Sequence, residues 1–154
     1  MKILLADDTE LIREGLKSML LQLSNPAICP EIRTACNGAE ALSLMREHPV
    51  DLLITDIRMP DVDGIELMRQ CRSQWANTSI VVISGYDDFK YAQQAIEYGA
   101  SAYLSPSPSR CFRMRSAKRN VPILRRGVSG STSSFTISGE LSPSMFSLLR
   151  YRKA

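Results

Sequence analysis

Carboxylate side chains follow apolar segments at two places in this chain of 154 residues. Asp7 and Asp8 come directly after residues 2–6, and Asp56 comes directly after residues 52–55. Crowded carboxylates repel one another unless a cation lies between them. Oxygen ligands without His or Cys favour Mg²⁺, and a carboxylate beside such an ion can attack phosphorus to give an acyl phosphate. We therefore expect magnesium-dependent phosphoryl transfer to a carboxylate.

A hydroxyl group stands at the same place after a third apolar segment. Ser84 follows residues 80–83 and precedes Gly85, and its hydroxyl group is a suitable hydrogen-bond donor for a phosphoryl group. A polar residue at a strand end is often only a solvated loop position, and that role stays open for each of the four side chains taken singly. Their joint placement favours one site.

These side chains require strands that deliver them to one edge of a sheet. Strands are predicted at residues 2–6, 31–36, 52–55 and 80–83, with a fifth that begins at residue 102. Amphipathic helices are predicted to begin at Thr9, after Gly38, near Ile65 and near Phe89. This alternation implies a parallel sheet covered on both faces, with right-handed crossovers. Ligands bind such sheets at the carboxyl ends of the strands, so the four side chains converge if the first, third and fourth strands are neighbours.

The apolar side of each helix follows from a spacing of three or four residues. The four sides comprise Leu11, Ile12, Gly15, Leu16, Met19, Leu20 and Leu23; Ala41, Leu42 and Met45; Ile65, Met68, Cys71 and Trp75; and Phe89, Ala92, Ala95 and Ile96. Asp87 or Asp88 is suited to cap the fourth helix, and Gly99 is suited to close it. These sides are expected to pack on the sheet.

Composition limits the class of protein. Hydrophobic residues make up 44% of the chain, which is enough for a packed core. No apolar run approaches the length of about 18 residues that a membrane span needs, and no charged-then-apolar leader is present, so we expect a cytoplasmic protein. The Cys residues stand at irregular spacings, which favours free thiols over a zinc site or disulfides.

Charge divides the chain into two segments. Residues 1–104 hold nine Lys or Arg against fifteen Asp or Glu, a net charge of −6, whereas residues 105–154 hold ten against one, a net charge of +9. Such a change indicates either a basic tail with a partner or two segments of different origin. We therefore expect one domain over residues 1–104, followed by a Ser-rich and Arg-rich tail.

Residues 1–104 resemble the receiver domain of bacterial two-component response regulators. The resemblance rests on four motifs: Leu4-Leu-Ala-Asp-Asp8, Asp56-Ile-Arg-Met-Pro-Asp-Val-Asp-Gly64, Val82-Ile-Ser-Gly85 and Gly99-Ala-Ser-Ala-Tyr-Leu104. The segment at residues 84–92 further resembles receivers attached to AraC-type DNA-binding domains. The resemblance implies an α/β fold, a doubly wound, flavodoxin-like parallel sheet of five strands in the order 2-1-3-4-5.

The resemblance also implies a role for each acidic residue. Asp56 would accept phosphate from a histidine kinase, which would be the partner of this chain. Asp7 and Asp8 would hold Mg²⁺ together with Asp56 and the backbone carbonyl group of Arg58. Such a domain is a phosphoacceptor, with at most self-phosphorylation and self-dephosphorylation activity, and is not otherwise an enzyme.

By the same resemblance, Ser84 would contact the phosphoryl group and shift inward, and Tyr103 would follow as an aromatic switch. An amphipathic ring at a sheet edge is the alternative for Tyr103. The output surface would be the fourth helix and fifth strand, through which a homodimer is expected. DNA binding is not expected from residues 1–104.

The chain departs from the family after Leu104. Pro106 stands where the family has a Lys that pairs with the phosphoryl group. No sustained helical pattern follows, so the last helix is expected to be missing or replaced, which would expose one flank of the sheet and the edge of the fifth strand. Residues 121–124 and 135–137 are candidate short strands, and residues 127–134 have the composition of a linker.

Two interpretations of the tail remain. A basic arm would bind nucleic acid or acidic lipid, although the tail lacks a helix-turn-helix pattern and DNA binding by it is not expected. The preferred hypothesis is a shifted reading frame, because the resemblance stops inside the fifth strand. With a flank uncovered, we expect reduced stability or a tendency to associate.

Two functions of different classes follow. The first is a phosphoacceptor signalling domain, and the alternative is an interaction module that keeps the receiver fold but no longer switches, since the sensing Lys is absent. A haloacid-dehalogenase-like phosphatase also uses an Asp nucleophile with Mg²⁺. That class usually has a second Asp two residues later, where this chain has Arg58, so it is disfavoured.

Overall fold

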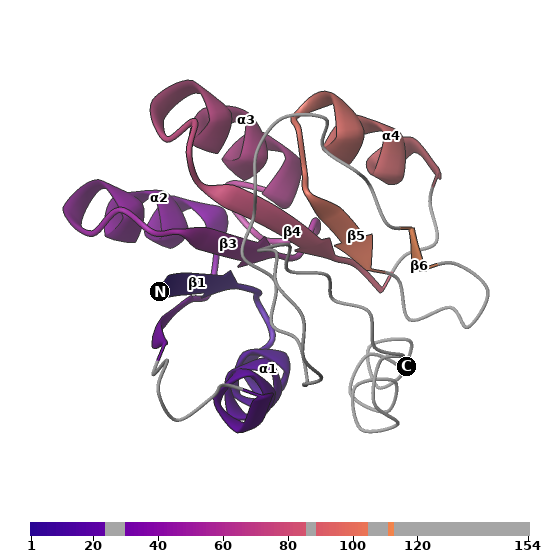
Figure 1. Ribbon diagram of the computed structural model, residues 1–154. Helices are drawn as coiled ribbons and strands as arrows, with labels where there is room; N and C mark the ends of the chain where they lie inside the picture. The colour runs from indigo at the N-terminus through magenta and orange to yellow at the C-terminus, as the bar shows by residue number, and fades with distance from the viewer. Residues whose placement is uncertain (24–29, 86–88, 105–110, 113–154) are drawn as a thin grey trace, which may run out of the picture.

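A computed structural model describes residues 1–23, 30–85, 89–104 and 111–112 of the chain. These residues form one sheet of six strands in the order β2-β1-β3-β4-β5-β6 (Figure 1). The strands are β1 (Lys2–Ala6), β2 (Glu31–Ala35), β3 (Leu52–Thr55), β4 (Ser79–Ile83), β5 (Ala102–Leu104) and β6 (Cys111–Phe112). The first five are parallel, which confirms the predicted flavodoxin-like order 2-1-3-4-5.

Helices cover both faces of the sheet. They are α1 (Glu10–Leu23), α2 (Gly38–Glu47), α3 (Gly64–Gln74) and α4 (Phe89–Glu97). In Figure 1, α2, α3 and α4 lie on one side of the sheet, and α1 lies on the other side, next to β1. No helix in the described part of the chain is long and apolar enough to cross a membrane.

Local sequence signals account for the ends of α2 and α4. Asn37 caps α2, because its side chain accepts a hydrogen bond from the Glu40 amide at 2.8 Å. The carboxylate of Glu40 in turn accepts one from the Cys36 amide at 2.6 Å, which gives a reciprocal arrangement like a capping box. Gly99 follows α4 with a φ of 69°, the left-handed conformation that favours glycine at this position.

The core has two layers, one on each face of the sheet. Alternation along β1 divides its side chains, since Leu4 and Ala6 face α2, α3 and α4 whereas Ile3 and Leu5 face α1. The first layer is the larger, and its fully buried members include Met45, Leu53, Leu67, Met68, Cys71, Ile80 and Val82. The second layer comprises Ile3, Leu5, Ile12, Leu16, Ile54, Val81, Ile83 and Leu104.

Two predicted core positions are wrong. Leu11 and Ile96 are each 54% exposed, although both were expected on apolar sides of their helices. The buried residue is a sequence neighbour in each helix: Ile12 follows Leu11, and Ala95 precedes Ile96. The predicted apolar stripes are wider than the strip of helix surface that the sheet can cover. Leu67 shows the opposite error, since it is fully buried in α3 but was not assigned to the apolar side.

The strand β6 has no counterpart in the sequence-based prediction. It pairs antiparallel with β5, with Tyr103 opposite Phe112 and Leu104 opposite Cys111. The expectation of an unpaired edge on the fifth strand is therefore wrong at Tyr103 and Leu104. The predicted Asp87 or Asp88 cap, Pro106 and the candidate tail strands lie outside the described residues.

Candidate functional site

The strand order brings three of the predicted polar residues to the same edge of the sheet. Ala6 of β1 is in register with Thr55 of β3, so Asp7 and Asp56 follow on the same rung, and the Asp56 amide donates to the Ala6 carbonyl at 2.9 Å. Ser84 follows β4, which is the next strand along. Asp7, Asp56 and Ser84 are 3%, 1% and 0% exposed, so all three are buried where the strands end.

Several hydrogen bonds hold Asp56 in place. Its Oδ2 atom accepts a hydrogen bond from the Arg58 amide at 3.0 Å, and its carbonyl oxygen accepts one from the Thr55 hydroxyl at 2.7 Å. Gly64, the first residue of α3, packs so closely that a Cβ atom there would overlap the Asp56 carbonyl oxygen. The amide of Gly64 also donates to the Ile57 carbonyl at 2.8 Å. The loop after β3 therefore folds back onto Asp56 and Ile57, where it begins, and fixes the orientation of the Asp56 carboxylate.

Asp7 and Asp8 occupy different environments although they are adjacent. The buried Oδ1 atom of Asp7 accepts a hydrogen bond from the Thr9 amide at 2.8 Å, and the Asp7 carbonyl accepts one from the Arg13 guanidinium at 2.6 Å. Asp8 is exposed and accepts a hydrogen bond from the Thr9 hydroxyl at 3.2 Å. Asp7 therefore also fixes the turn into α1, and Asp8 faces outward.

A pocket of about 460 Å³ lies beside these acidic residues. Its lining consists of Asp8, Ile57, Arg58, Met59, Pro60, Asp63 and Tyr91. The Arg58 guanidinium carbon lies 5.9 Å from the centroid of the Tyr91 ring, within the range of a cation–π contact. This contact joins the loop after β3 to α4. Neither Tyr91 nor the side chain of Arg58 was assigned to the site from sequence, because only the fold brings α4 over this loop.

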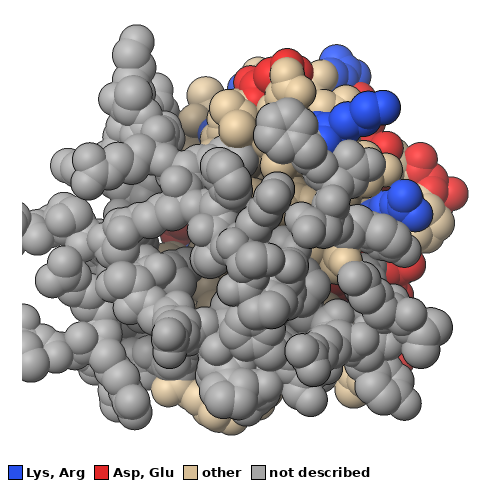
Figure 2. All heavy atoms as spheres, turned by 90° about the vertical axis from the view of Figure 1, so that its right-hand side faces the viewer, with Lys and Arg blue, Asp and Glu red and all other residues tan. Residues whose placement is uncertain are grey.

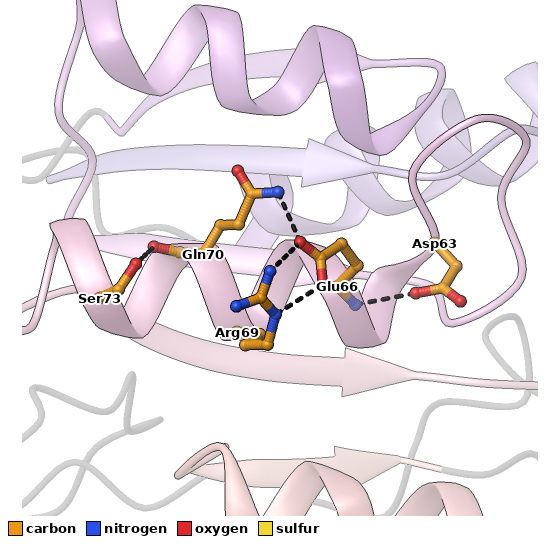
Figure 3. A network of polar contacts seen from close by, with 5 residues as sticks. All are labelled: Asp63, Glu66, Arg69, Gln70 and Ser73. Atoms are coloured by element: carbon orange, nitrogen blue, oxygen red, sulfur yellow. Dashed lines mark hydrogen bonds and ion pairs between the residues drawn. The ribbon is translucent and has the colours of Figure 1, made fainter.

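The start of α3 is held by a polar network that begins at the pocket (Figure 3). Asp63 caps the helix by accepting from the Glu66 amide at 2.8 Å. Glu66 receives hydrogen bonds from Arg69 and then Gln70, which lower the pKa of its carboxyl group to about 2. Glu66 is therefore ionised at neutral pH, in the first turn where the helix dipole favours negative charge.

Ser84 and Tyr103 lie on neighbouring strands. The Ser84 amide donates to the Leu104 carbonyl at 3.0 Å, so the end of β4 is tied to β5. Tyr103 is 4% exposed and belongs to the core layer beneath α2, α3 and α4. Its ring is therefore buried. Its part in a switch stays a prediction.

Arg72 is a structural residue that the sequence analysis missed. Its guanidinium group donates to the carbonyl groups of Tyr98 at 3.0 Å, Thr78 at 2.7 Å and Gly99 at 2.6 Å, and more weakly to Ala76 at 3.3 Å. These carbonyls belong to the segment before β4 and the segment after α4. One side chain of α3 therefore positions the entry to β4 and the turn that leads to β5.

The acidic residues at this edge of the sheet are the candidate ligands for a metal ion. Within the residues that the structure describes, no group of three or more His, Cys, Asp or Glu side chains lies together as a metal site. Mg²⁺, however, keeps several waters and typically takes only one or two carboxylates. The adjacent strand ends that carry Asp7 and Asp56, with Asp8 next in sequence, supply the hard oxygen donors that this ion prefers. The coordination by Asp7, Asp8, Asp56 and the Arg58 carbonyl stays a prediction.

The fold and this edge of the sheet define a doubly wound α/β protein with a buried acidic site at the carboxyl ends of β1 and β3. Residues 3–108 match the family described as the response regulator receiver domain. The chain therefore belongs to the response regulator receiver family of two-component systems.

Individual relatives agree with this assignment. An uncharacterized response regulatory protein of Staphylococcus epidermidis is 39% identical over 103 residues, and the transcriptional regulatory protein HptR of Staphylococcus aureus is 38% identical over 103 residues. The match covers 67% of this chain but only 39% of each relative. The chain thus spans about two fifths of the length of these curated relatives.

A solved structure has a similar fold. The response regulator protein TrrA from Thermotoga maritima, in complex with Mg²⁺ and BeF, is 32% identical, with a TM-score of 0.59. The match covers 68% of this chain and 84% of that chain.

Proposed function

We propose that this chain is the phosphoacceptor domain of a response regulator, with Asp56 as the residue that accepts the phosphoryl group from a histidine kinase. The observation that carries the proposal is the buried carboxylate of Asp56, held by the Arg58 amide at the carboxyl end of β3 beside the end of β1 that carries Asp7. Receiver domains are regulatory phosphoacceptors that interact with histidine kinases, and this chain belongs to that family.

The transfer follows from the groups present. A carboxylate oxygen of Asp56 attacks phosphorus, a new O–P bond forms, and the P–N bond of the donor phosphohistidine breaks, with the imidazole as leaving group. Asp7, Asp8, Asp56 and the Arg58 carbonyl would hold Mg²⁺, together with water. When bound, Mg²⁺ supplies positive charge that offsets the charge on the transferring group. The TrrA complex, which contains Mg²⁺ and BeF, supports this assignment by similarity.

Ser84 and Tyr103 are proposed to relay the modification. The Ser84 hydroxyl donates a hydrogen bond to the phosphoryl group and moves inward, and Tyr103 follows within the core layer beneath α4. The change alters the surface formed by α4 and β5, through which the domain pairs with a second copy. The proposed domain comprises residues 1–104, and the basic segment of residues 105–154 follows it and contributes β6 to the sheet.

Charge on the surface is consistent with protein partners rather than DNA for the domain. Where the described residues are visible in Figure 2, acidic side chains lie beside the basic ones. Residues 1–104 carry a net charge of −6, whereas binding to the phosphate backbone of DNA usually requires a basic patch.

Incubation of the full chain with Mg²⁺ and acetyl phosphate tests the proposal. Intact mass spectrometry is expected to show one added phosphoryl group on the wild type and none on Asp56→Asn. Asp61→Asn is the matched control, because Asp61 is exposed in the same loop and Asn tolerates its φ of 64°. Equal phosphorylation of wild type and Asp56→Asn would disprove the assignment.

A second measurement separates the proposal from a module that no longer switches. Amide hydrogen exchange in α4 and β5 is compared before and after phosphorylation. A change that depends on Asp56 supports switching despite Pro106. Phosphorylation without any change in exchange would favour the interaction module.

A further inference from the structure

The contact between Arg58 and Tyr91 connects the loop after β3 with the first turn of α4. The Arg58 guanidinium carbon lies 5.9 Å from the centroid of the Tyr91 ring, and both residues line the pocket beside the acidic residues. Arg58 is exposed, whereas Tyr91 is half-buried and packs against the larger core layer. The guanidinium group therefore rests on a ring that belongs to the packing of α4 on the sheet.

The same residue contacts the candidate phosphoacceptor through its backbone. The Arg58 amide donates to Oδ2 of Asp56 at 3.0 Å, so this one residue touches both the Asp56 carboxylate and α4. The backbone of the loop is held in place, because Gly64 packs closely against the Asp56 carbonyl oxygen. The long, exposed side chain of Arg58 starts from that fixed backbone. A change of charge at Asp56 can therefore move this side chain without movement of the loop.

Phosphorylation of Asp56 introduces a group that attracts a guanidinium group. A phosphoryl group carries a charge of about −1.5 to −2 and strong acceptor oxygens. Among the described residues that line the pocket, Arg58 is basic, whereas Asp8 and Asp63 are acidic. A guanidinium group binds phosphate oxygens through parallel N–H···O hydrogen bonds. Arg58 is therefore the residue of this lining that suits a phosphoryl group.

The phosphoryl group is a stronger partner for Arg58 than the Tyr91 ring is. The attraction between a cation and an aromatic face is weak at an exposed site, and the separation of 5.9 Å is close to its limit of about 6 Å. A hydrogen bond between a guanidinium group and a phosphate oxygen joins opposite charges and is about twice as strong as a neutral one. When both partners compete for this guanidinium group, the contact with Tyr91 is therefore the one that breaks.

We propose that Arg58 couples the phosphorylation site to α4. Its guanidinium group rests on Tyr91 in the unphosphorylated chain and moves to the phosphoryl group when Asp56 is modified, so the first turn of α4 loses a contact with the loop after β3. The inference rests on the proposed phosphorylation of Asp56. Position 106 holds Pro, and in this chain the loop after β3 supplies the cation that meets the phosphoryl group.

Fluorine NMR of the full chain labelled with 3-fluorotyrosine tests the proposal, because the Tyr91 signal reports the surroundings of that ring. The signal is assigned by its absence from Tyr91→Phe. Incubation with Mg²⁺ and acetyl phosphate is expected to shift the Tyr91 signal of the wild type in step with the gain in mass. In Arg58→Gln the signal is expected close to the phosphorylated position before acetyl phosphate is added, and it is expected to move less afterwards.

Lys90→Gln is the matched control, because Lys90 is exposed and the change removes a positive charge from the same turn of α4. Its Tyr91 signal is expected to shift on phosphorylation as in the wild type. A complete gain in mass with an unmoved Tyr91 signal in the wild type overturns the inference and leaves the proposed function intact. Equal shifts in the wild type and Arg58→Gln also overturn the inference alone. No gain in mass on the wild type overturns the proposed function and the inference together.

A second variant keeps the test valid if Arg58→Gln does not fold or does not accept the phosphoryl group. Tyr91→Leu keeps Arg58 and an apolar side chain on α4 but removes the aromatic face. Without acetyl phosphate, amide hydrogen exchange over residues 89–97 is expected to be several-fold faster than in the wild type, and phosphorylation is expected to change it little. A rise on phosphorylation as large as that of the wild type would contradict the proposal, because the coupling would then bypass Tyr91.

Discussion

At the scale of single residues, Asp56 depends on a neighbour that carries no side chain. Gly64 begins α3, and its Cα lies so close to Asp56 that a Cβ atom would overlap the Asp56 carbonyl oxygen. The same short loop sets the hydrogen bond from the Arg58 amide to the Asp56 carboxylate at 3.0 Å. The glycine therefore sets the orientation of the carboxylate through the backbone, because any side chain at position 64 pushes the loop away from β3.

Gly64→Ala is predicted to destabilise the fold by about 1 to 3 kcal/mol, because backbone has to move to make room for the methyl group. Urea unfolding of the full chain measures this loss. Phosphorylation by acetyl phosphate is expected to slow in the fraction that remains folded. Gly15→Ala is the matched control, since it adds the same methyl group in the interior of α1, where alanine favours the helix. Equal stability of Gly64→Ala and wild type would show that the loop adjusts freely.

The buried thiol of Cys71 gives a prediction in pH. Burial raises the pKa of Cys71 from 9.0 to about 11, and the side chain is fully buried in α3. A raised pKa in the folded state means that the folded protein holds this proton more tightly than the unfolded chain. The stabilisation is therefore complete below pH 9 and is lost as the pH rises toward 11.

Comparison of wild type with Cys71→Ala isolates this effect from other groups that titrate in the same range. Between pH 9 and pH 11, the free energy of unfolding of the wild type is predicted to fall by on the order of 1 to 2 kcal/mol more than that of Cys71→Ala. Urea midpoints at several pH values provide the measurement. Parallel pH profiles for the two proteins would refute the prediction.

Sequence reasoning at this scale placed the candidate site residues at strand ends but did not give their surroundings. Asp7, Asp56 and Ser84 were placed at strand ends, because apolar runs followed by polar residues mark those ends directly. The sequence did not predict that Asp7 is buried and Asp8 exposed, because this difference depends on the turn at Thr9. The contact of Arg58 with Tyr91 joins two segments far apart in sequence, which no local pattern encodes.

At the scale of elements, Arg72 links α3 to the segment before β4 and to the segment after α4. It donates to carbonyl groups before β4 and after α4, at distances between 2.6 and 3.3 Å. Carbonyl groups at helix ends lack partners within the helix, and a guanidinium group satisfies several at once. The turn from α4 into β5 is therefore fixed by a side chain from a different helix.

Arg72→Ala is predicted to destabilise the protein by about 2 kcal/mol, because two partly buried carbonyl groups lose a charged donor. Arg72→Lys is expected to recover little, since an ammonium group cannot reach carbonyls on both segments. Thermal unfolding gives the stability, and hydrogen exchange at residues 98–101 locates the effect. Arg69→Ala in the same helix is the control, because Arg69 is exposed and pairs with Glu66 at the surface, so its loss is expected to destabilise the protein less than the loss of Arg72. An Arg72→Ala protein as stable as Arg69→Ala would contradict this role.

The elements themselves were largely predictable. The strands at residues 2–6 and 52–55 have the predicted bounds, because apolar runs and turn residues mark them. The helix faces were less accurate, as Leu11 and Ile96 show, because periodicity does not say how wide a strip the sheet covers. The short strand β6 could not be predicted, since two residues contain no period and its pairing comes from β5.

At the scale of the whole molecule, the chain after β5 adds a sixth strand to one edge of the sheet. Residues 1–104 supply three helices on one face of the sheet and one on the other, with α1 beside β1. The far edge of the sheet is paired with β6, which comes from the segment that does not resemble the family in sequence. The hypothesis of a shifted reading frame concerns the origin of that segment and is tested by translation of the encoding DNA in the other two frames. The role of the segment in the folded chain is a separate question.

The pairing of β6 with β5 gives a prediction at this scale. In an antiparallel pair, opposed residues alternate between hydrogen-bonded and non-hydrogen-bonded positions, so one of Cys111 and Phe112 donates its amide to β5. Replacing both with proline removes that donor whichever residue supplies it. The variant is predicted to exchange the amide of Tyr103 faster, because the Leu104 carbonyl already pairs with Ser84 on the β4 side. It is also predicted to associate more readily, because an unpaired strand edge is a template for a second chain.

Hydrogen exchange followed by peptide mass spectrometry measures the first effect, and light scattering over a range of concentrations measures the second. The control replaces Ser116 and Ala117 with proline, which introduces the same two residues into the tail outside β6. Faster exchange at β5 in both variants would assign the effect to the tail as a whole. Unchanged exchange and an unchanged oligomeric state in the Cys111 and Phe112 variant would show that β6 does not protect the edge of the sheet in solution.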